Sequence, residues 1–556
     1  MKYDVAIVGG GPAGSTCGTL LRKYSPHLKV VILEREQFPR DHVGESQLPM
    51  ISKILDEMGV WDKVERANFP IKVGATYRWG RTDDLWDFQF IPNGELKPEA
   101  RPAKFAGQRT QTAFQVDRAV YDKILLDHAA SVGCEVRQQT TVRQVLSDGD
   151  TVQGLVLEGG EVVEASHYVD ASGHVGVIRR AMGVETQAPT TLQNIAIWDY
   201  WQNAEWAVKI GIGGTRVQVM SLGYGWIWFI PLGPTRTSVG LIVPAQYYKD
   251  TGKKPQDLYL EALHSDPIIE PLLRNATSEG QLSTTKDWSF LADRLAGENW
   301  FLAGESAGFA DPILAAGMSL AHAGAREVAY TILAMRRGDY EAEWLRSRYD
   351  ESHRRQIGQH IRFADFWYTH NGLFGDLKDL TREIAGEQGL ALSAEEAWRW
   401  FGQGGFIDHD AVGTGFGGYS LTAVKQIAGD FIDGQLHFEM EGRNHFVANL
   451  EGAEKTFGAT LAEGRIARHR CYKRDGKIVP NHGICGWLLA ALKTPKTLTE
   501  LMQPMRQGAV GFGPAELYET LEAMISDGWI TSSTVEGIDR VITARVDNSA
   551  VITRRS

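Results

Sequence analysis

The sequence predicts an α/β protein: a Rossmann-like nucleotide-binding domain with an inserted antiparallel β-sheet, followed by an α-rich C-terminal extension that ends in a winged-helix-like unit. Three observations support this fold class. Residues 3–33 read as strand, glycine-rich turn, helix and strand. Residues 190–245 are rich in tryptophan and strand-forming residues, and residues 345–400 change to a helical pattern rich in His, Arg and aromatic side chains.

The expected domains follow these changes along the chain. Residues 1–345 form the nucleotide-binding core, in which the inserted sheet takes about 60–115 and 185–290. Residues 346–480 form a helical and mixed extension, and residues 481–556 form the winged-helix-like unit.

The winged-helix-like unit is predicted from local signals. We expect helices over 484–492 and 514–526, a capping box at 497–500, and strands near 529–533 and 540–546. A winged helix raises the possibility of a regulator that binds DNA. Glu516, Glu519 and Glu522 recur at helical spacing and predict an acidic face that would repel phosphate, so a docking role is the better interpretation.

Composition narrows the class of protein. The chain has 556 residues and a net charge of -11, which argues against a nucleic-acid partner. The four cysteines show neither disulfide nor metal-site spacing, and we read Cys17 and Cys134 as buried thiols and expect no metal. The chain enters a strand directly after Met1 and has no run of about 18 apolar residues, so we expect no signal peptide, no transmembrane segment and a cytoplasmic location.

The first motif is Gly9-Gly10-Gly11-Pro12-Ala13-Gly14, which fits G-x-G-x-x-G between a strand and a helix. Glycines there let the backbone approach a pyrophosphate, which then lies on the positive end of the helix. Glu34 ends the second strand and suits a ribose hydroxyl. A plain tight turn is the alternative, but strand, helix and acidic residue in register favour a dinucleotide.

A second motif indicates that this dinucleotide is FAD. Residues 304–312 (Gly-Glu-Ser-Ala-Gly-Phe-Ala-Asp-Pro) resemble the second FAD fingerprint of the aromatic-hydroxylase-type flavoproteins, with Glu305 where that family usually has Asp. Residues 170–173 (Asp-Ala-Ser-Gly) resemble the middle motif of the same superfamily, and Arg118 matches a position that usually touches the cofactor. The residues expected to bind FAD are Gly9, Gly11, Pro12, Ala13, Gly14, Glu34, Arg35, Arg40, Glu45, Ser46, Arg118, Gly304, Glu305, Asp311 and Pro312.

A third motif is more specific. Residues 225–231 (Gly-Trp-Ile-Trp-Phe-Ile-Pro) match W-x-W-x-I-P, and the chain on this evidence resembles the flavin-dependent halogenases. Alternation on a strand puts Trp226 and Trp228 on one face, where the resemblance implies that they keep substrate away from the flavin. Spacing alone fits a tryptophan-rich core strand equally well.

Two further stretches support the resemblance. Residues 39–46 resemble the segment that lies along the flavin, and residues 69–75 resemble the segment with the active-site lysine, here Lys72. The alternative for Lys72 is a surface lysine whose stem packs on apolar neighbours. The resemblance covers about residues 1–370 and is closest to the chloramphenicol- and chondrochloren-type subgroup, which acts on carrier-bound substrates and has an additional C-terminal domain.

The halide site departs from the family pattern. Halogenases of this kind often have Ser or Thr before the Gly that binds chloride, whereas this chain has Ala315-Ala316-Gly317. Backbone N–H groups at a helix start hold much of such an anion, so Ala316 and Gly317 remain the expected halide-binding residues.

The resemblance implies the following reaction. Reduced FAD from a separate flavin reductase, oxygen, and chloride or bromide give a hypohalous acid, which Lys72 relays to an electron-rich aromatic or activated acyl substrate. A carrier protein presents that substrate, in secondary-metabolite or antibiotic biosynthesis. A hydroxylase (monooxygenase) or a lipid reductase of the same fold is the alternative that Ala315-Ala316 favours. A flavin-sensing regulator with a winged-helix tail is the alternative of another class, which the acidic helix face opposes.

Overall fold

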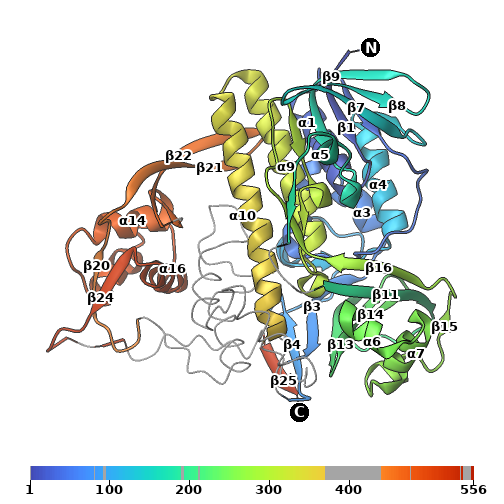
Figure 1. The fold of residues 1–556 in the computed structure, drawn as a ribbon. Coiled ribbons are helices and arrows are strands. Elements are labelled where there is room, and N and C mark those ends of the chain that lie inside the picture. Colours follow the sequence, from blue (N-terminus) through green and yellow to red (C-terminus); the bar gives the residue numbers. More distant parts are fainter. Residues whose placement is uncertain are drawn as a thin grey trace. The chain divides into compact units, whose positions relative to one another are not determined.

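The computed structural model describes residues 2–79, 82–91, 95–188, 193–210, 213–369, 440–475, 477–538, 540–541 and 552–555. The chain forms two compact units, Met1–Ala391 together with Ala550–Ser556, and Leu392–Ser549 (Figure 1). The helical pattern expected beyond residue 369 and nearly all of the strand expected at 540–546 lie outside the described residues.

The larger unit is built on a parallel sheet ordered β6-β2-β1-β9-β18. Its strands are β1 (Lys2–Val8), β2 (Val30–Leu33), β6 (Glu135–Arg137), β9 (Val162–Asp170) and β18 (Trp300–Leu302). Helix α1 (Pro12–Tyr24) joins β1 to β2 and packs against α4 (Arg118–Ser131) and α9 (Ala316–Arg337). Strands β1 and β2 are buried and mostly apolar, because helices cover both faces of a parallel sheet.

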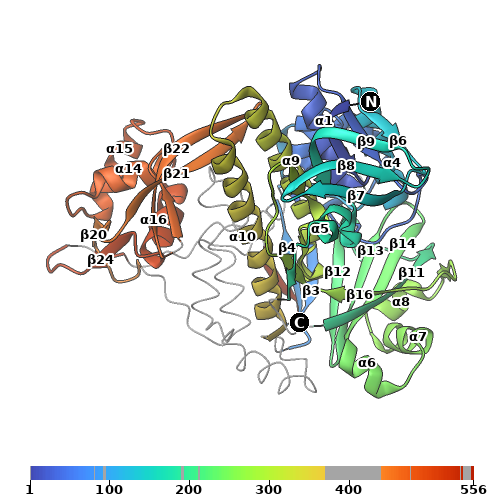
Figure 2. The ribbon, with the colours of Figure 1, turned by 45° about the horizontal axis from the view of Figure 1, so that its top comes forward.

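Two antiparallel strands extend the same sheet beyond β9. Strands β7 (Val142–Asp148) and β8 (Thr151–Leu157) form a hairpin, and β8 continues onto β9. Figure 2 shows β7, β8 and β9 together at this end of the unit.

The inserted sheet has the order β15-β11-β14-β13-β12-β3-β4-β25, with β16 on β11 and β5 on β3. Its strands are β3 (Ile71–Arg78), β4 (Leu85–Gln89), β5 (Ala113–Phe114), β11 (Gln193–Gln202), β12 (Gly214–Leu222), β13 (Gly225–Pro231), β14 (Arg236–Pro244), β15 (Thr277–Ser278), β16 (Ser283–Trp288) and β25 (Ile552–Arg555). It is antiparallel except for β3 and β12, which run parallel. Helices α7 (Pro255–Ser265) and α8 (Ile269–Leu273) pack on β11, β13 and β14 and form a second core.

Strand β25 was not expected here. The sequence-based domains put residues 481–556 together, but β25 pairs with β4 in the larger unit. The chain therefore returns to its first unit at its end, as Figure 1 shows.

The remaining elements of the larger unit connect these sheets. They are α2 (Pro49–Met58), α3 (Trp61–Arg66), α5 (Val177–Ala181), α6 (Ala245–Thr251), α7 (Pro255–Ser265), α8 (Ile269–Leu273), α10 (Ala342–Thr369), β10 (Thr186–Gln187), β17 (Phe290–Ala292) and β19 (Gly308–Phe309), with single-turn helices at Gly107–Gln111, Gly173–Val175, Gly304–Ser306 and Pro312–Leu314. The long helix α10 packs along α9.

The smaller unit has its own apolar core. Its described elements are β20 (His445–Ala448), β21 (Glu454–Ala462), β22 (Arg465–Arg474), β23 (Lys477–Pro480), α14 (Gly483–Ala491), α15 (Leu498–Arg506), α16 (Pro514–Ser526) and β24 (Ile530–Ser533). The predicted capping box is confirmed, since the Glu500 N–H donates to Thr497 Oγ1 and the Thr497 N–H donates to Glu500 Oε2. The predicted acidic face is partly wrong, because Glu522 is buried and accepts the Met440 N–H at 3.0 Å.

Three properties of the chain bear on its class. All four cysteines are buried free thiols, as expected for Cys17 and Cys134. Within the described ranges, no three His, Cys, Asp or Glu side chains cluster as metal ligands. Across the same ranges no helix combines the length and apolarity that a membrane crossing needs, and the cytoplasmic location stays a prediction.

Candidate functional site

The glycine-rich turn after β1 is built for close backbone approach. Gly9 has φ of +105°, and a Cβ there would lie 2.2 Å from the Ala171 carbonyl oxygen. A Cβ on Gly14 would lie 1.9 Å from the Gly9 oxygen. Gly11, the N-cap of α1, is different, because the nearest atom to an added Cβ would be Arg40 Nη2 at 3.6 Å. Gly9 and Gly14 therefore hold the turn together, whereas Gly11 leaves open space at the helix N-terminus, where a pyrophosphate fits.

Glu34 closes this turn from β2. Its Oε2 accepts the Gly10 N–H at 2.6 Å, and its Oε1 accepts the Glu36 N–H at 2.8 Å. The carboxylate is thus fixed beside the glycines, which suits a group that meets a ribose hydroxyl. Arg35 points away, with its side chain about half exposed and 3.2 Å from Glu36, so the structure does not bring it to the turn.

Arg40 and Arg118 meet on one buried carboxylate. Arg118 donates to both oxygens of Asp122 at 2.7 and 2.9 Å, and Arg40 lies 3.1 Å from Asp122 Oδ2. Arg118 Nη1 also donates to the carbonyls of Val43 and Gly44 at 3.0 and 3.1 Å. Arg118 therefore fastens the segment before Glu45 to α4. Asp122 has no motif of its own and was missed from the sequence.

Glu45 is fully buried and has an unusual carboxyl group. Burial raises the pKa of Glu45 to about 7, although the Tyr200 hydroxyl donates to Oε1 at 3.1 Å and the Gly44 N–H donates to Oε2 at 3.3 Å. The neighbouring Ser46 Oγ is buried and has no hydrogen-bond partner among the described residues. A buried hydroxyl without a partner is costly, so this segment fits a bound group that would supply the missing bond.

The second fingerprint lies on the middle motif. The Ala303 N–H donates to the Asp170 carbonyl at 2.8 Å, and a Cβ on Gly173 would lie 3.7 Å from Glu305 Oε2. The longer acid Glu305 thus faces the Asp-Ala-Ser-Gly turn. Gly304, with φ of +66°, turns the chain from β18 toward it.

The expected halide site lies at the start of α9. Ala315 takes a left-handed conformation, with φ of +55°, and caps the 22-residue helix without a side-chain hydrogen bond. Ala316 is buried, and a Cβ on Gly317 would have no heavy atom nearer than 4.0 Å. The N–H groups of this first turn are therefore available to an anion.

The loop before α9 is bound to the inserted sheet. Asp311 Oδ2 accepts from Asn194 Nδ2 of β11 at 3.2 Å, and the Ile313 carbonyl accepts from the Tyr77 hydroxyl of β3 at 3.2 Å. Asp311 is buried, which raises its pKa to about 6. Pro312 opens the single turn that follows. The strand that carries Lys72 thus contacts the loop before α9 through Tyr77.

The two tryptophans pack on one face of β13, as alternation predicted. Their ring centroids are 6.1 Å apart. Trp228 donates to Ser238 at 3.0 Å and lies across Gly240, where any Cβ would enter the indole ring. Trp226 Nε1 donates to the Tyr368 hydroxyl at 2.7 Å, which in turn donates to Asp311 Oδ1 at 3.0 Å. Tyr368 of α10 therefore joins strand β13 to the loop before α9.

Lys72 is 2% exposed on β3, between Thr215 of β12 and Ala113 of β5. The register with β12 shifts directly after Lys72, so the strand bulges at this point, as strands often do at functional sites. Nζ lies 5.8 Å from the centroid of the Phe90 ring, and no described carboxylate pairs with it. Burial alone lowers the pKa of Lys72 from 10.5 to about 7. The surface alternative is therefore wrong for this lysine.

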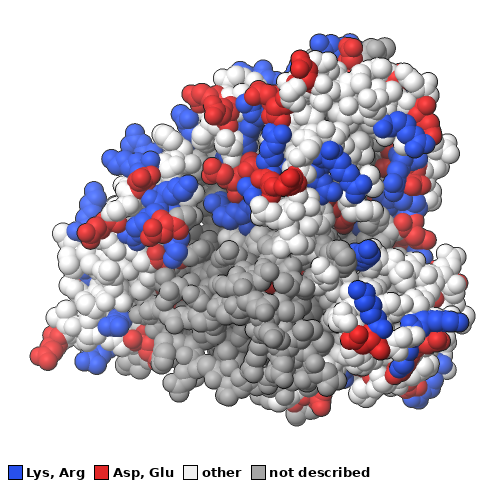
Figure 3. Space-filling view, viewed as in Figure 1, with Lys and Arg blue, Asp and Glu red and all other residues white. Residues whose placement is uncertain are grey.

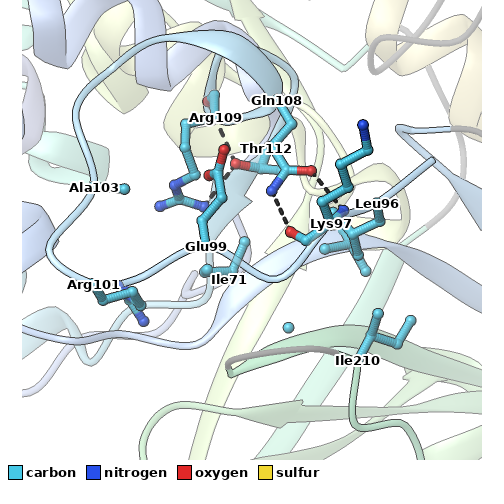
Figure 4. A pocket seen from close by; sticks show the side chains of 12 residues that line it. Ile71, Leu96, Lys97, Glu99, Arg101, Ala103, Gln108, Arg109, Thr112 and Ile210 are labelled. Carbon is cyan, nitrogen blue, oxygen red and sulfur yellow. Dashed lines mark hydrogen bonds between the residues drawn. The ribbon is translucent and has the colours of Figure 1, made fainter.

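A pocket lies beside the lysine strand but not around the lysine (Figure 4). Ile71 and Val73 line it, whereas Lys72 does not. The polar side chains of its wall form hydrogen bonds within the protein. Arg109 donates to Glu65 at 2.7 Å, and the Gln108 side-chain amide forms hydrogen bonds with the Lys97 backbone. We therefore do not assign this pocket to the reaction.

The larger unit is similar in sequence to known proteins. A family model described as FAD binding domain matches residues 2–364. The 1H-pyrrole-2-carbonyl-(peptidyl-carrier protein) chlorinase of Pseudomonas fluorescens is 31% identical over 386 residues, which cover 67% of this chain and 85% of that protein.

Solved structures extend the similarity. The flavin-dependent halogenase CmlS aligns with a TM-score of 0.75 and 25% identity, over 99% of this chain and 100% of that one. The myxobacterial chondrochloren halogenase CndH aligns with a TM-score of 0.60 and 28% identity, over 70% of this chain and 91% of that one. The alignment with CmlS includes the C-terminal unit.

Proposed function

Because this chain belongs to the flavin-dependent halogenases and has FAD as its cofactor, we propose that it delivers an electrophilic halogen to its substrate through the amine of Lys72. The observation that carries the proposal is a buried lysine with no counter-ion among the described residues. Because burial lowers its pKa to about 7, the Lys72 amine is neutral far more often at neutral pH than a lysine in water. Only a neutral amine has the lone pair that takes up a halogen.

Reduced FAD, supplied by a separate flavin reductase, together with oxygen and chloride or bromide, supplies a hypohalous acid when bound. We propose that the N–H groups of Ala316 and Gly317 hold the halide. At Lys72, an N–H bond breaks and an N–halogen bond forms, and the released proton leaves with the hydroxide of the acid as water. Transfer to a substrate carbon then releases a proton from that carbon and restores the amine.

Two further groups would support this route. Burial raises the pKa of Glu45 to about 7, so its carboxyl can gain or lose a proton near neutral pH, and we propose it as the proton carrier. The indole rings of Trp226 and Trp228 pack against each other on one face of β13. We propose that they keep the substrate from direct contact with the cofactor. Direct contact would allow hydroxylation instead.

The proposed substrate is an electron-rich aromatic or activated acyl group on a carrier protein, as part of secondary-metabolite biosynthesis. The support is that a relative 31% identical over 386 residues is named for a pyrrole-2-carbonyl group on a peptidyl carrier protein.

The test is aerobic incubation of the FAD-loaded enzyme with a flavin reductase, chloride, and pyrrolyl or phenolic substrates, each both free and carrier-bound, with intact mass as readout. A mass increase of one chlorine for hydrogen in the wild type, absent in Lys72→Ala with unchanged oxygen consumption, supports the proposal. A hydroxylated product from the wild type would overturn it and favour the hydroxylase.

A further inference from the structure

One face of the hairpin β21–β22 carries three cations around an aromatic ring. In the antiparallel register Phe457 lies opposite Arg470, and Lys455 lies opposite Tyr472. Arg468 is two residues from Arg470 on β22, so it shares this face. Its guanidinium carbon lies 4.5 Å from the centroid of the Phe457 ring. We call these four residues, Lys455, Phe457, Arg468 and Arg470, the basic face.

The basic face is open to solvent. Phe457 is 48% exposed, and the three cations are exposed as well. Neither Lys455 nor Arg470 forms an ion pair with a described residue. Figure 3 shows several Lys and Arg side chains, with some acidic side chains among them, over the region of β21 and β22 at the upper left of the view. An exposed ring surrounded by cations resembles a protein interface, in which an apolar centre has a polar rim.

Charge is unevenly distributed in this protein. Residues 455–477 contain seven Lys or Arg and two Asp or Glu, although the whole chain has a net charge of -11. Such a local reversal of sign selects an acidic partner and repels basic ones. Nucleic acid is the less suitable partner, because three cations neutralise few phosphates, and the rest of the chain is acidic.

We propose that the basic face docks an acidic carrier protein, the one that presents the tethered substrate. This inference rests on the proposed function, which needs a carrier. It adds the surface that recognises the carrier, and it assigns that role to the C-terminal unit rather than to the FAD-binding unit.

The experiment uses the full-length, FAD-loaded enzyme and an acidic holo carrier protein that is labelled on its phosphopantetheine thiol, with binding followed by fluorescence anisotropy. The test variant is Arg468→Glu with Arg470→Glu. The control is Arg465→Glu with Lys473→Glu, which makes the same charge change on exposed residues of the same strand but on its other face. A second test variant, Phe457→Ser, removes the ring without changing charge.

We expect the test pair to weaken binding at least 10-fold and Phe457→Ser at least 3-fold, with the control within 3-fold of the wild type. Wild-type binding should weaken as salt is raised. Equal loss in the test and control pairs would overturn the inference in favour of general charge attraction. Retention of duplex DNA in place of carrier, lost in the test pair, would make the face a nucleic-acid surface.

The two proposals fail differently. If the wild type halogenates carrier-bound substrate and the test pair does so with unchanged KM, the docking inference is wrong and the proposed function stands. If the wild type halogenates only free substrate and binds no carrier, the carrier part of the proposed function is also wrong. Raised KM with unchanged kcat in the test pair supports both.

Discussion

Lys72 should reduce the stability of the enzyme it serves. A shift in pKa from 10.5 to about 7 means that the protonated amine is about 5 kcal/mol less favourable in the folded protein than in water. Below pH 7 both folded and unfolded chains carry the charge, so the whole penalty applies. As pH rises from 7 to 10.5 the folded amine is neutral while the unfolded one is still charged, and the penalty falls, to about 2 kcal/mol at pH 9.

Lys72→Met keeps the length of the side chain and removes its charge. We therefore expect a higher Tm at pH 6, by roughly 3 to 6 °C for a unit of this size, and a much smaller gain at pH 9. The assay is thermal unfolding of the FAD-loaded protein at both pH values. The same variant should consume oxygen and form no halogenated product.

The control is Lys53→Met on α2, where the side chain is exposed and the change in Tm should be close to zero at either pH. A Tm that falls in Lys72→Met, or rises equally at both pH values, would show that Lys72 is not a desolvated amine. The argument for a neutral, halogen-accepting lysine would then fail with it.

Three further predictions concern the cofactor and the proton. Gly11→Val should lower FAD content at least 10-fold with little change in the melting of the apoprotein, because the added side chain enters the open space where the pyrophosphate would lie. Normal FAD content in this variant would contradict the pyrophosphate site. Gly14→Val is a poorer test because its side chain would disrupt the turn itself. Glu45→Gln should abolish the decline in halogenation rate that we expect above about pH 7, where the wild-type carboxyl loses its proton; a decline that persists in the variant assigns it to another group. NADH without an added reductase should reduce the bound FAD slowly, and rapid reduction in a stopped-flow trace would argue for a one-component hydroxylase.

The fold could be predicted from sequence where a motif and its local structure coincide. Residues 9–14 lie within one turn, and the alternation of Trp226 and Trp228 lies within one strand, so neighbours in sequence are also neighbours in space. The same holds for the capping box at Thr497 and Glu500.

Contacts between distant segments could not be predicted in this way. Tyr368 is 142 residues from Trp226 and 57 from Asp311, and nothing in its local sequence marks it as the link between them. Glu522 has helical spacing typical of a solvated face, but the tertiary fold buries it against the Met440 N–H. Burial also decides the chemistry of Lys72, since its apolar neighbours fit a surface stem and a pocket equally well.

Strand β25 affects how the activity of a C-terminally truncated protein should be interpreted. Because β25 pairs along β4 and Arg555 binds Asp87 at 2.8 Å, the final residues complete an edge of the inserted sheet. A stop codon after residue 391 would remove the C-terminal unit and this edge strand together, leaving the unpaired backbone groups of β4 open to aggregation. Loss of activity in such a truncation would not identify the role of the C-terminal unit, whereas an internal deletion that joins residues 391 and 550 through a linker keeps the edge closed and isolates that role.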